Sequence, residues 1–177
     1  MFAGKSAHCG PINAVNIKIT LPLLCVTFVL DSSALFSMED IPDDSVCPPG
    51  VLDELKRYKD PRIERWGDLL RVSDCTSSSV NSVKTAAERS GDIGRLSDVD
   101  VSVIALALDV KGIILTDDYS IQNVSKILGI EYRSVGTSGI KKVEKWNYRC
   151  NGCGKWFKEN VKECPICGHS TRSHRKR

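Results

Sequence analysis

The chain has 177 residues, 41% of them hydrophobic and 27% charged, so it can bury one core with a small appendage. This ordinary globular composition, with no long low-complexity tract, excludes a fibrous or largely disordered protein. The net charge of +3 is unevenly divided: residues 141–177 carry eleven basic and three acidic side chains, and residues 1–140 carry fourteen and nineteen. An acidic body with a basic tail indicates two tasks, and the natural partner of the tail is a polyanion.

An apolar stretch over residues 17–30 does not suit a membrane span or a secretory signal. It is 14 residues long, contains Lys18 and Pro22, and ends before Asp31, whereas a bilayer-spanning helix needs about 20 apolar residues. Cleavage of a signal here would also remove the strand predicted over Val26–Leu30. We therefore expect no membrane partner, and residues 1–24 give no clear fold signal.

Strands and helices alternate along the rest of residues 25–138. We expect short strands near Val46 and over 71–75, helices over 51–60, 61–70 and 77–92, a largely buried helix from Ser97 to Gly112, a strand over 113–116, a helix over 117–129 and a strand over 130–135. Such alternation predicts an α/β fold with a mostly parallel sheet flanked by helices.

Acidic side chains follow two of the predicted strands. Asp31 follows the strand over 26–30, and Asp117 and Asp118 follow the strand over 113–116. Ligands of parallel α/β sheets bind beyond the carboxyl ends of the strands, and the helices that carry Glu54 and Asp100 can begin at that edge. Gathered carboxylates raise one another's pKa unless a cation lies among them. Their hard oxygen ligands favour Mg²⁺ or Mn²⁺.

Each acid also has a purely structural interpretation. Asp31 or Asp117 could cap the helix that follows it. Asp100 stands three residues after Ser97, in a variant of the capping box, and Glu54 could simply be solvated. The convergence of several acids at one sheet edge favours a metal site. A divalent ion there would activate water and stabilise the leaving oxygen during cleavage of a phosphodiester.

Four segments resemble, in order, the acidic motifs of PIN-domain nucleases: VLDSSAL at 29–35, VLDEL at 51–55, LSDVDVSVIALAL at 96–108 and ILTDDYSIQN at 114–123. The resemblance covers residues 25–135 and implies a metal-dependent single-strand ribonuclease with four acids at one sheet edge. By position these acids are Asp31, Glu54, Asp100 and Asp118. Asp117 is an additional acid of open role, and Thr116 and Ser33 would orient carboxylates or water.

Four of the eight cysteines form two C-x2-C pairs, separated by ten residues and each followed by a glycine. This spacing is typical of two metal-binding knuckles. The expected ligands are Cys150, Cys153, Cys164 and Cys167, with Zn²⁺ favoured over a rubredoxin-like iron. Such pairs indicate a metal site in a reducing compartment, and hence a cytoplasmic protein, rather than a disulfide framework. The scattered cysteines at positions 9, 25, 47 and 75 are expected to be small buried hydrophobic residues or inert thiols.

The cysteine module also carries aromatic and basic side chains suited to stacking on single-stranded RNA and to contact with its phosphates. The candidates are Arg149, Lys155, Trp156, Lys158, Lys162, Arg172 and Arg175. Tyr148 could contribute, whereas Phe157 is expected to cover the small core. The tail over 169–177 is expected to be disordered alone and to pair with phosphates. Four cysteines complete the metal site, so His169 and His174 are not assigned as ligands.

A PIN domain followed by such a zinc ribbon resembles the archaeal Nob-type endonucleases of ribosome biogenesis. The resemblance implies cleavage at the 3′ end of small-subunit ribosomal RNA within a pre-ribosomal particle. The expected parts are an N-terminal extension (1–24), a nuclease domain (25–138), a basic linker (139–147), a zinc ribbon (148–170) and a basic tail (171–177).

Three alternatives remain open. A generic PIN-type RNA nuclease, such as a toxin, would share the acids but normally stops near the third predicted strand, before any ribbon. A non-catalytic RNA-binding module of ribosome assembly would keep the ribbon and lose the acids. A phosphatase of the haloacid-dehalogenase type also places an aspartate after its first strand, but it needs Asp-x-Asp, and here Ser33 stands at the second position.

Overall fold

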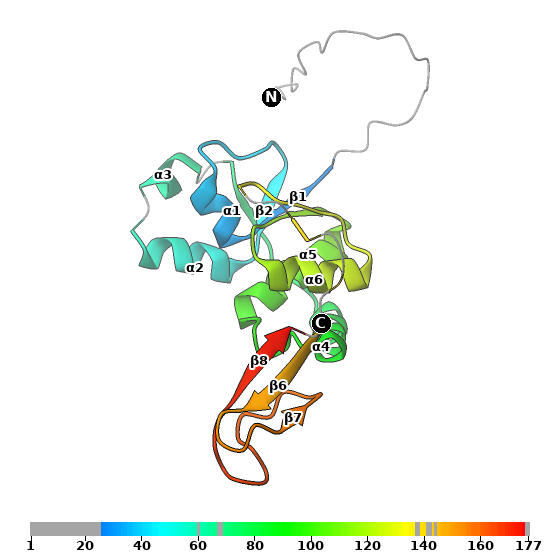
Figure 1. Cartoon of the computed structure of the whole chain (residues 1–177). Coiled ribbons are helices and arrows are strands. Elements are labelled where there is room, and N and C mark those ends of the chain that lie inside the picture. Colours follow the sequence, from blue (N-terminus) through cyan, green and yellow to red (C-terminus); the bar gives the residue numbers. More distant parts are fainter. Residues whose placement is uncertain are drawn as a thin grey trace, which may run out of the picture.

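The computed structural model describes residues 26–59, 61–66, 69–136, 139–140, 143 and 145–175. The expected extension over 1–24 lies outside these residues. Figure 1 shows an α/β body and, beyond helix α4, a separate small sheet formed by the C-terminal strands. None of the helices in the described ranges is long and apolar enough to cross a bilayer.

The body is built on a parallel sheet of five strands in the order β3-β2-β1-β4-β5. The strands are β1 (Phe28–Leu30), β2 (Ser45–Cys47), β3 (Arg71–Val72), β4 (Ile113–Leu115) and β5 (Tyr132–Arg133). Every neighbouring pair is parallel, which confirms the predicted fold class. The first strand begins at Phe28 rather than Val26, because both neighbouring strands begin opposite Phe28 and Val26 is 45% exposed.

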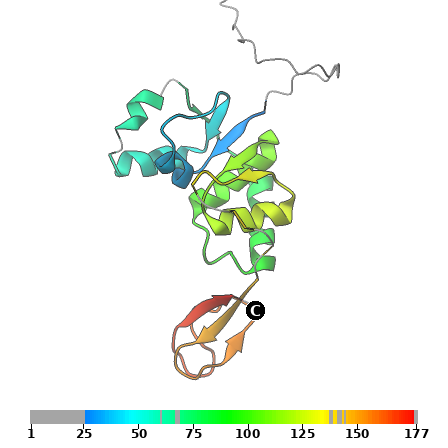
Figure 2. The ribbon, with the colours of Figure 1, turned by 45° about the horizontal axis from the view of Figure 1, so that its top comes forward.

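Six helices in the described residues complete the body. They are α1 (Ser32–Ser37), α2 (Pro49–Arg57), α3 (Arg62–Trp66), α4 (Ser77–Ser90), α5 (Asp98–Val110) and α6 (Tyr119–Leu128). Helix α4 packs on α5 and α6, while α1 packs on α2. Figure 2 shows the first three helices on one side of the body and the last three on the other.

Helix ends follow local signals. Gly91 ends α4 and Gly129 ends α6, both with positive φ in the left-handed region that glycine adopts most easily. Helix α5 was expected to end at Gly112, but the left-handed residue is Lys111, with φ 52°. Gly112 has a different role, since a Cβ there would lie 2.8 Å from the Thr27 carbonyl oxygen. This glycine lets the chain enter β4 close beside β1.

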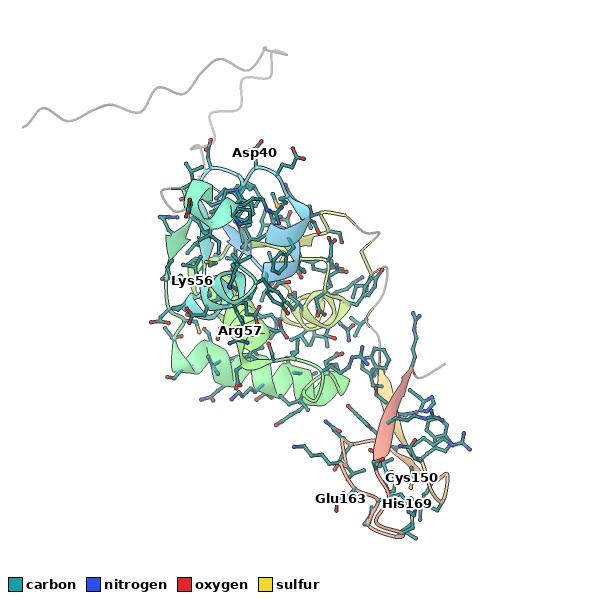
Figure 3. All side chains as sticks on the ribbon, turned by 90° about the vertical axis from the view of Figure 1, so that its left-hand side faces the viewer. Asp40, Lys56, Arg57, Cys150, Glu163 and His169 are labelled. Atoms are coloured by element: carbon teal, nitrogen blue, oxygen red, sulfur yellow. The ribbon has the colours of Figure 1, made fainter. Side chains whose placement is uncertain are left out.

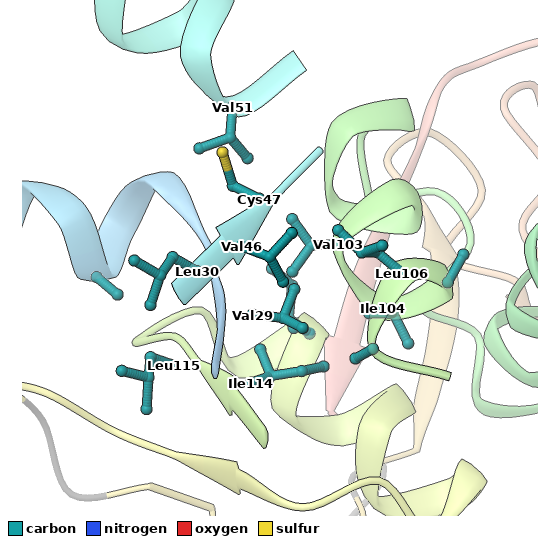
Figure 4. Close-up of a cluster of buried hydrophobic side chains, with 14 of the residues drawn as sticks. Val29, Leu30, Val46, Cys47, Val51, Val103, Ile104, Leu106, Ile114 and Leu115 are labelled. Atoms are coloured by element: carbon teal, nitrogen blue, oxygen red, sulfur yellow. The ribbon is translucent and has the colours of Figure 1, made fainter. Parts of the chain in front are cut away.

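The core lies between the sheet and α5. Figure 4 shows the strand residues Val29, Val46 and Ile114 facing Val103 and Leu106 of the helix. All of these side chains are buried, and full burial of one such side chain stabilises the fold by about 1.5–3 kcal/mol. Because the helix is buried nearly all round, as its sequence predicted, its first turn is held firmly at the sheet edge.

The C-terminal sheet is antiparallel, in the order β7-β6-β8. Its strands are β6 (Trp146–Cys150), β7 (Trp156–Phe157) and β8 (Thr171–Arg175), and we call residues 146–175 the ribbon. The expectation that the tail is disordered is wrong for residues 171–175, because they pair along the whole of β6. Strand β6 likewise includes Trp146 and Asn147 from the expected linker. The predicted domain boundaries, as limits of parts that fold independently, stay a prediction.

Candidate active site and cysteine metal site

Asp31 lies at the carboxyl end of β1 and is 2% exposed. Its Oδ2 accepts hydrogen bonds from the Ser33 hydroxyl at 2.6 Å and the Thr116 hydroxyl at 2.8 Å. It stands at the N-cap position of α1, but its side chain makes no capping hydrogen bond. Capping therefore does not explain why a carboxyl group is buried at the end of a core strand.

Thr116 and Ser33 join the ends of β1 and β4. Besides its bond to Asp31, Thr116 accepts the backbone N–H of Asp118 at 3.0 Å, and Ser33 accepts that of Asp117 at 3.1 Å. Each hydroxyl donates to the carboxyl group and accepts from the backbone. The orientation of Asp31 is thus fixed from both strands.

Three acids at this edge influence one another electrostatically. Burial raises the pKa of Asp31, and the charge of Asp118 raises it further, while hydrogen bonds from Ser33 and Thr116 oppose the rise. Burial also raises the pKa of Asp100, and the charges of Asp31 and Asp118 add to it. Each negative charge makes the next less favourable, so the edge favours a bound cation.

Replacing Thr116 with valine should weaken the site without disturbing the strand. Valine keeps the β-branched shape but loses the hydroxyl that lowers the pKa of Asp31. The acidic limb of the activity–pH profile should therefore move to higher pH, and divalent-metal affinity should fall about tenfold, as for other residues that orient metal ligands. Thr116→Ser, which keeps the donor, is the matched control, and an unchanged profile in the valine variant would contradict the proposed role.

Asp100 and Asp118 each combine a capping bond with a place near Asp31. We call the sheet edge that carries these three acids the acidic edge. Asp100 Oδ2 accepts the Ser97 N–H at 2.7 Å and Ser97 Oγ accepts the Asp100 N–H, which forms the capping box of α5. Asp118 Oδ1 accepts the N–H groups of Ser120 and Ile121, so Asp118, not Asp117, caps α6. A carboxyl group has two oxygens, and a capping bond to one leaves the other for a ligand.

Asp117 has a structural role. Its carboxyl oxygens accept the backbone N–H groups of Val135 and Gly136, at 3.0 and 2.9 Å. These bonds hold the segment that follows β5 against the end of β4. The acid whose role the sequence left open thus supports the loop next to the site.

Glu54 lies on α2, on a face of the helix that is turned toward α5. It is half-buried and lies one helical turn after Gly50, and residues four apart share a helix face. A Cβ on Gly50 would come 2.8 Å from a Val99 methyl group, so this face of α2 lies against the first turn of α5. The absence of a side chain at Gly50 lets α2 approach the first turn of α5, and a place for Glu54 beside the other acids stays a prediction.

Gln122 is a supporting residue that sequence reasoning missed. It is fully buried, and its Nε2 donates to the Thr116 carbonyl and to Ser134 Oγ, both at 3.0 Å. Its Oε1 accepts the Ile140 N–H at 2.9 Å. The sequence feature that could have identified Gln122 is an amide side chain one helical turn after Asp118, among the apolar positions of a short helix.

The acidic edge offers only oxygen ligands, which suits Mg²⁺ or Mn²⁺. Within the described ranges, ligand atoms of three or more His, Cys, Asp or Glu residues come within 4.8 Å of one another only at the four cysteines. Mg²⁺ commonly keeps several waters and takes only one or two carboxylates, so it does not need three of these carboxyl groups within that distance.

The four predicted cysteine ligands come together at one end of the ribbon. Their Sγ atoms lie within 4.8 Å of one another, with Cys150 and Cys167 3.4 Å apart and Cys153 and Cys164 3.6 Å apart. Tetrahedral Zn²⁺ with bonds of about 2.3 Å places its sulfur ligands about 3.8 Å apart. The four sulfurs thus form a metal-binding group whose geometry fits zinc.

The loops of the cysteine site also favour a thiolate. Burial opposes ionisation of Cys150, but N–H groups of Cys153 and Gly152 and the Cys167 thiol outweigh it and lower its pKa to about 6. His169 lies close by, as Figure 3 shows, and its Nδ1 is 3.0 Å from the Cys167 carbonyl oxygen. His169 is not among the clustered ligands.

The seven predicted RNA-binding residues of the ribbon are all exposed. Arg149 of β6 stands opposite Trp156 of β7 and Arg172 of β8, so these three side chains share one face of the sheet. The Trp156 ring, 52% exposed, lies 5.6 Å from the Arg149 guanidinium and 5.2 Å from the His174 ring. Tyr148 points the other way and is buried against Gly91, so it cannot stack on RNA.

Proteins similar to this chain are ribonucleases. A family model described as the PIN domain of ribonuclease matches residues 28–110. Endoribonuclease Nob1 of Pyrococcus abyssi is 40% identical, with 82% of this chain and 92% of that protein covered. Ribonuclease VapC1 of Thermoplasma acidophilum is 36% identical, with 98% and 93% covered, and Endoribonuclease Nob1 of Archaeoglobus fulgidus is 38% identical, with 79% and 86% covered. These alignments extend over most of both chains.

Proposed function

The chain belongs to the PIN-domain ribonucleases, and from that membership we propose that it is a metal-dependent single-strand endoribonuclease that matures the 3′ end of small-subunit ribosomal RNA. The observation that carries the proposal is the carboxyl group of Asp31, buried at the end of a core strand and held by Ser33 and Thr116, with Asp100 and Asp118 near enough for their charges to interact. Similarity to two Nob1 endoribonucleases supports the ribosomal assignment.

In the proposed mechanism, Mg²⁺ or Mn²⁺ would be held at the sheet edge by Asp31, Glu54, Asp100 and Asp118. Ser33 and Thr116 fix the orientation of Asp31, and the capping bonds fix Asp100 and Asp118. The cation, when bound, supplies activation of water and neutralisation of charge at the phosphodiester. The sequence has no histidine between residues 9 and 168, so the carboxyl groups and their hydroxyl partners are the polar groups available for this chemistry.

The partner is a pre-ribosomal particle in the cytoplasm, and the ribbon, holding Zn²⁺, provides its RNA contacts. Among the described residues of the body, Cys47 and Cys75 are free thiols, which supports a reducing compartment. The basic side chains around Trp156 support contact with single-stranded RNA.

Replacing Trp156 with alanine should weaken RNA binding about tenfold, because stacking of one base on an aromatic ring contributes about 1–3 kcal/mol. Trp156→Phe keeps a ring and should restore most of the affinity. Arg149→Gln should lower the salt dependence of binding by about one phosphate contact. Fluorescence anisotropy with a labelled single-stranded RNA at several salt concentrations measures both effects. Equal affinities of the alanine and wild-type proteins would remove this face from the proposed interface.

The proposal is tested by cleavage of an RNA that spans the mature 3′ end of small-subunit ribosomal RNA, with Mn²⁺ or Mg²⁺. A discrete cut at that end is expected, and it should be lost with EDTA. An RNA of equal length from another part of the same ribosomal RNA is the matched control. Absence of any cut, with tight binding that needs the ribbon, would instead indicate an RNA-binding module.

One comparison favours a second candidate, a PIN ribonuclease not tied to ribosomal RNA. The relative named Ribonuclease VapC1 aligns over nearly the whole chain, ribbon included. The same assay separates the candidates, because a generic nuclease would cut the control RNA as readily as the ribosomal one.

A further inference from the structure

Two exposed aromatic rings touch each other where α1 packs on α2. The rings of Phe36, on α1, and Tyr58, the C-cap residue of α2, have centres 5.4 Å apart and planes at 90°. Tyr58 is 71% exposed and Phe36 is 39% exposed. In this arrangement the edge of one ring meets the face of the other, so much of the ring surface stays open to solvent. Exposed apolar surface of this kind is typical of a binding site.

The end of α1 is held in place by Arg62 of α3. Its Nη1 donates to the Phe36 carbonyl at 3.2 Å and to the Met38 carbonyl at 2.9 Å. Its guanidinium also lies 5.1 Å from the centre of the Trp66 ring, which is buried in the core. These contacts fix the backbone from which the Phe36 ring projects.

Three cations accompany Tyr58. Lys56, Arg57 and Lys59 are all exposed, and Figure 3 shows Lys56 and Arg57 on the body, apart from the labelled residues of the ribbon. Within the described part of the chain, none of these three side chains forms an ion pair. Exposed cations without an anionic partner attract a polyanion. We call Phe36, Tyr58 and the three cations the aromatic patch.

The aromatic patch lies close to the end of β1 that carries Asp31. Asp31 stands at the N-cap position of α1, and Phe36 follows it by about 7.5 Å along the helix axis at the usual rise per residue. Tyr58 lies one turn after Glu54, whose carbonyl accepts its N–H at 3.1 Å. Each ring thus follows a proposed catalytic acid on the same helix. Figure 2 shows these helices on the side of the body away from α4 and the ribbon.

We propose that the aromatic patch is a binding site for single-stranded RNA, with a base stacked on the ring pair and the neighbouring phosphates held by the three cations. Stacking requires a base whose face is free, and a duplex offers no such base within its length. The patch therefore selects single strands beside the acidic edge, whereas cations alone would also bind a duplex. The inference rests on the proposed function, although binding can be tested without cleavage.

The first test uses the full-length, zinc-loaded chain with Asp31→Asn, so that the RNA stays intact. In this parent, Tyr58→Ala should lower the affinity for a single-stranded RNA about tenfold, through the loss of one stacking ring. Its affinity for a duplex of the same sequence should not change. Tyr58→Phe keeps the ring and should bind as the parent does. Fluorescence anisotropy measures each affinity.

Two results of this test would overturn the proposal. Equal single-strand affinities of the parent and Tyr58→Ala would exclude stacking and would point to a protein partner for the patch. An equal loss of affinity for the single strand and the duplex would show that the ring does not distinguish the two forms of RNA.

The contribution of charge is tested with two matched arginines. Arg57 and Arg89 each lie in the last turn of a helix, α2 and α4, and both are exposed. Arg57→Gln should lower the salt dependence of RNA binding by about one phosphate contact, and Arg89→Gln should leave it unchanged. An equal change in both variants would mean that binding follows net charge rather than the patch, which would contradict the proposal.

A series of RNAs that each lack one base locates the stacked base. Removing that base should lower the affinity of the parent about tenfold and have little effect on Tyr58→Ala, because the ring that it contacts is already absent. A series in which no position distinguishes the two proteins would refute stacking at Tyr58.

Cleavage is measured separately, with Asp31 restored and Mn²⁺ added. Absence of any cut, with the binding results as expected, would refute the proposed function and leave the patch as an RNA-binding site. A cut by the wild type, with no effect of Tyr58→Ala on binding, would support the proposed function and overturn the patch.

Discussion

Replacing Asp31 with asparagine should reduce kcat for RNA cleavage by at least about a thousandfold. Asparagine keeps the shape of the side chain and can still accept one hydroxyl bond, but it carries no charge with which to hold a divalent cation. Asp31 is the buried acid on which both Ser33 and Thr116 converge, so its loss removes the centre of the cluster. Asp98→Asn, an exposed acid on the helix that carries Asp100, is the matched control and should cleave normally.

The same variant separates a catalytic from a structural role through its stability. Burial raises the folded-state pKa of Asp31 and of Asp100 above the ordinary 3.8, so without metal the folded chain holds these protons more tightly than the unfolded chain. The contribution of these two acids to the free energy of unfolding of the metal-free wild type should therefore fall as pH rises from about 3.8 through the raised pKa values. Asp31→Asn removes one of these ionisations and should weaken the dependence.

Thermal unfolding with and without Mn²⁺ at several pH values measures this difference. Mn²⁺ should stabilise the wild type most where the acids are ionised, and should have little effect on Asp31→Asn. A variant that is inactive and also unfolds far more easily at every pH would instead show that Asp31 holds the fold together.

The acidic edge was predictable where its signals are local. The strand that ends at Asp31 and the Ser97–Asp100 capping box can each be recognised within a few residues, and both are present. The assignment of the α6 cap to Asp118 was less accessible, because Asp117 and Asp118 are equivalent in sequence. In the structure, Asp118 bonds to the first turn of α6, while Asp117 bonds to N–H groups of the loop after β5. That loop is distant in sequence and is brought near by the pairing of β4 with β5.

The structure of the ribbon could likewise be predicted only in part from its sequence. Its cysteines follow a regular spacing, but strand β8 has a polar sequence, Thr171 to Arg175, with no apolar alternation to indicate a strand. Its stability comes from pairing with β6 and from the cysteine site, both non-local. Tyr148 appeared to be one exposed aromatic among several, and its burial depends on a carbonyl of the body, that of Gly91. The contact between the two sheets is non-local, so the partner of Tyr148 cannot be identified from the residues around it in the sequence.

Removing the metal from the cysteine site should unfold the ribbon and leave the body folded. Among its described residues, only Tyr148, Cys150 and Cys164 are buried, which is too little apolar surface to stabilise three short strands alone. The bound ion contributes on the order of 10 kcal/mol to the folding of such a unit. Cys164→Ser should have the same effect as a chelator, because it removes one of four ligands.

Hydrogen exchange resolves the two parts in one experiment. After Cys164→Ser, amides of β6 and β8 should exchange rapidly, while those of β1, β4 and α5 keep their protection, because the core around α5 contains no ribbon residue. Cys75→Ser, at a half-buried thiol of the body, is the matched control and should leave ribbon exchange unchanged. Persistent protection of β6 in the Cys164 variant would mean that contacts with the body, such as the bonds from Trp146 to Asp92 and from Tyr148 to Gly91, hold the ribbon together rather than the metal. If the metal holds it, the variant should lose RNA affinity as well, since Arg149 and Trp156 share one face only while β6 and β7 are paired.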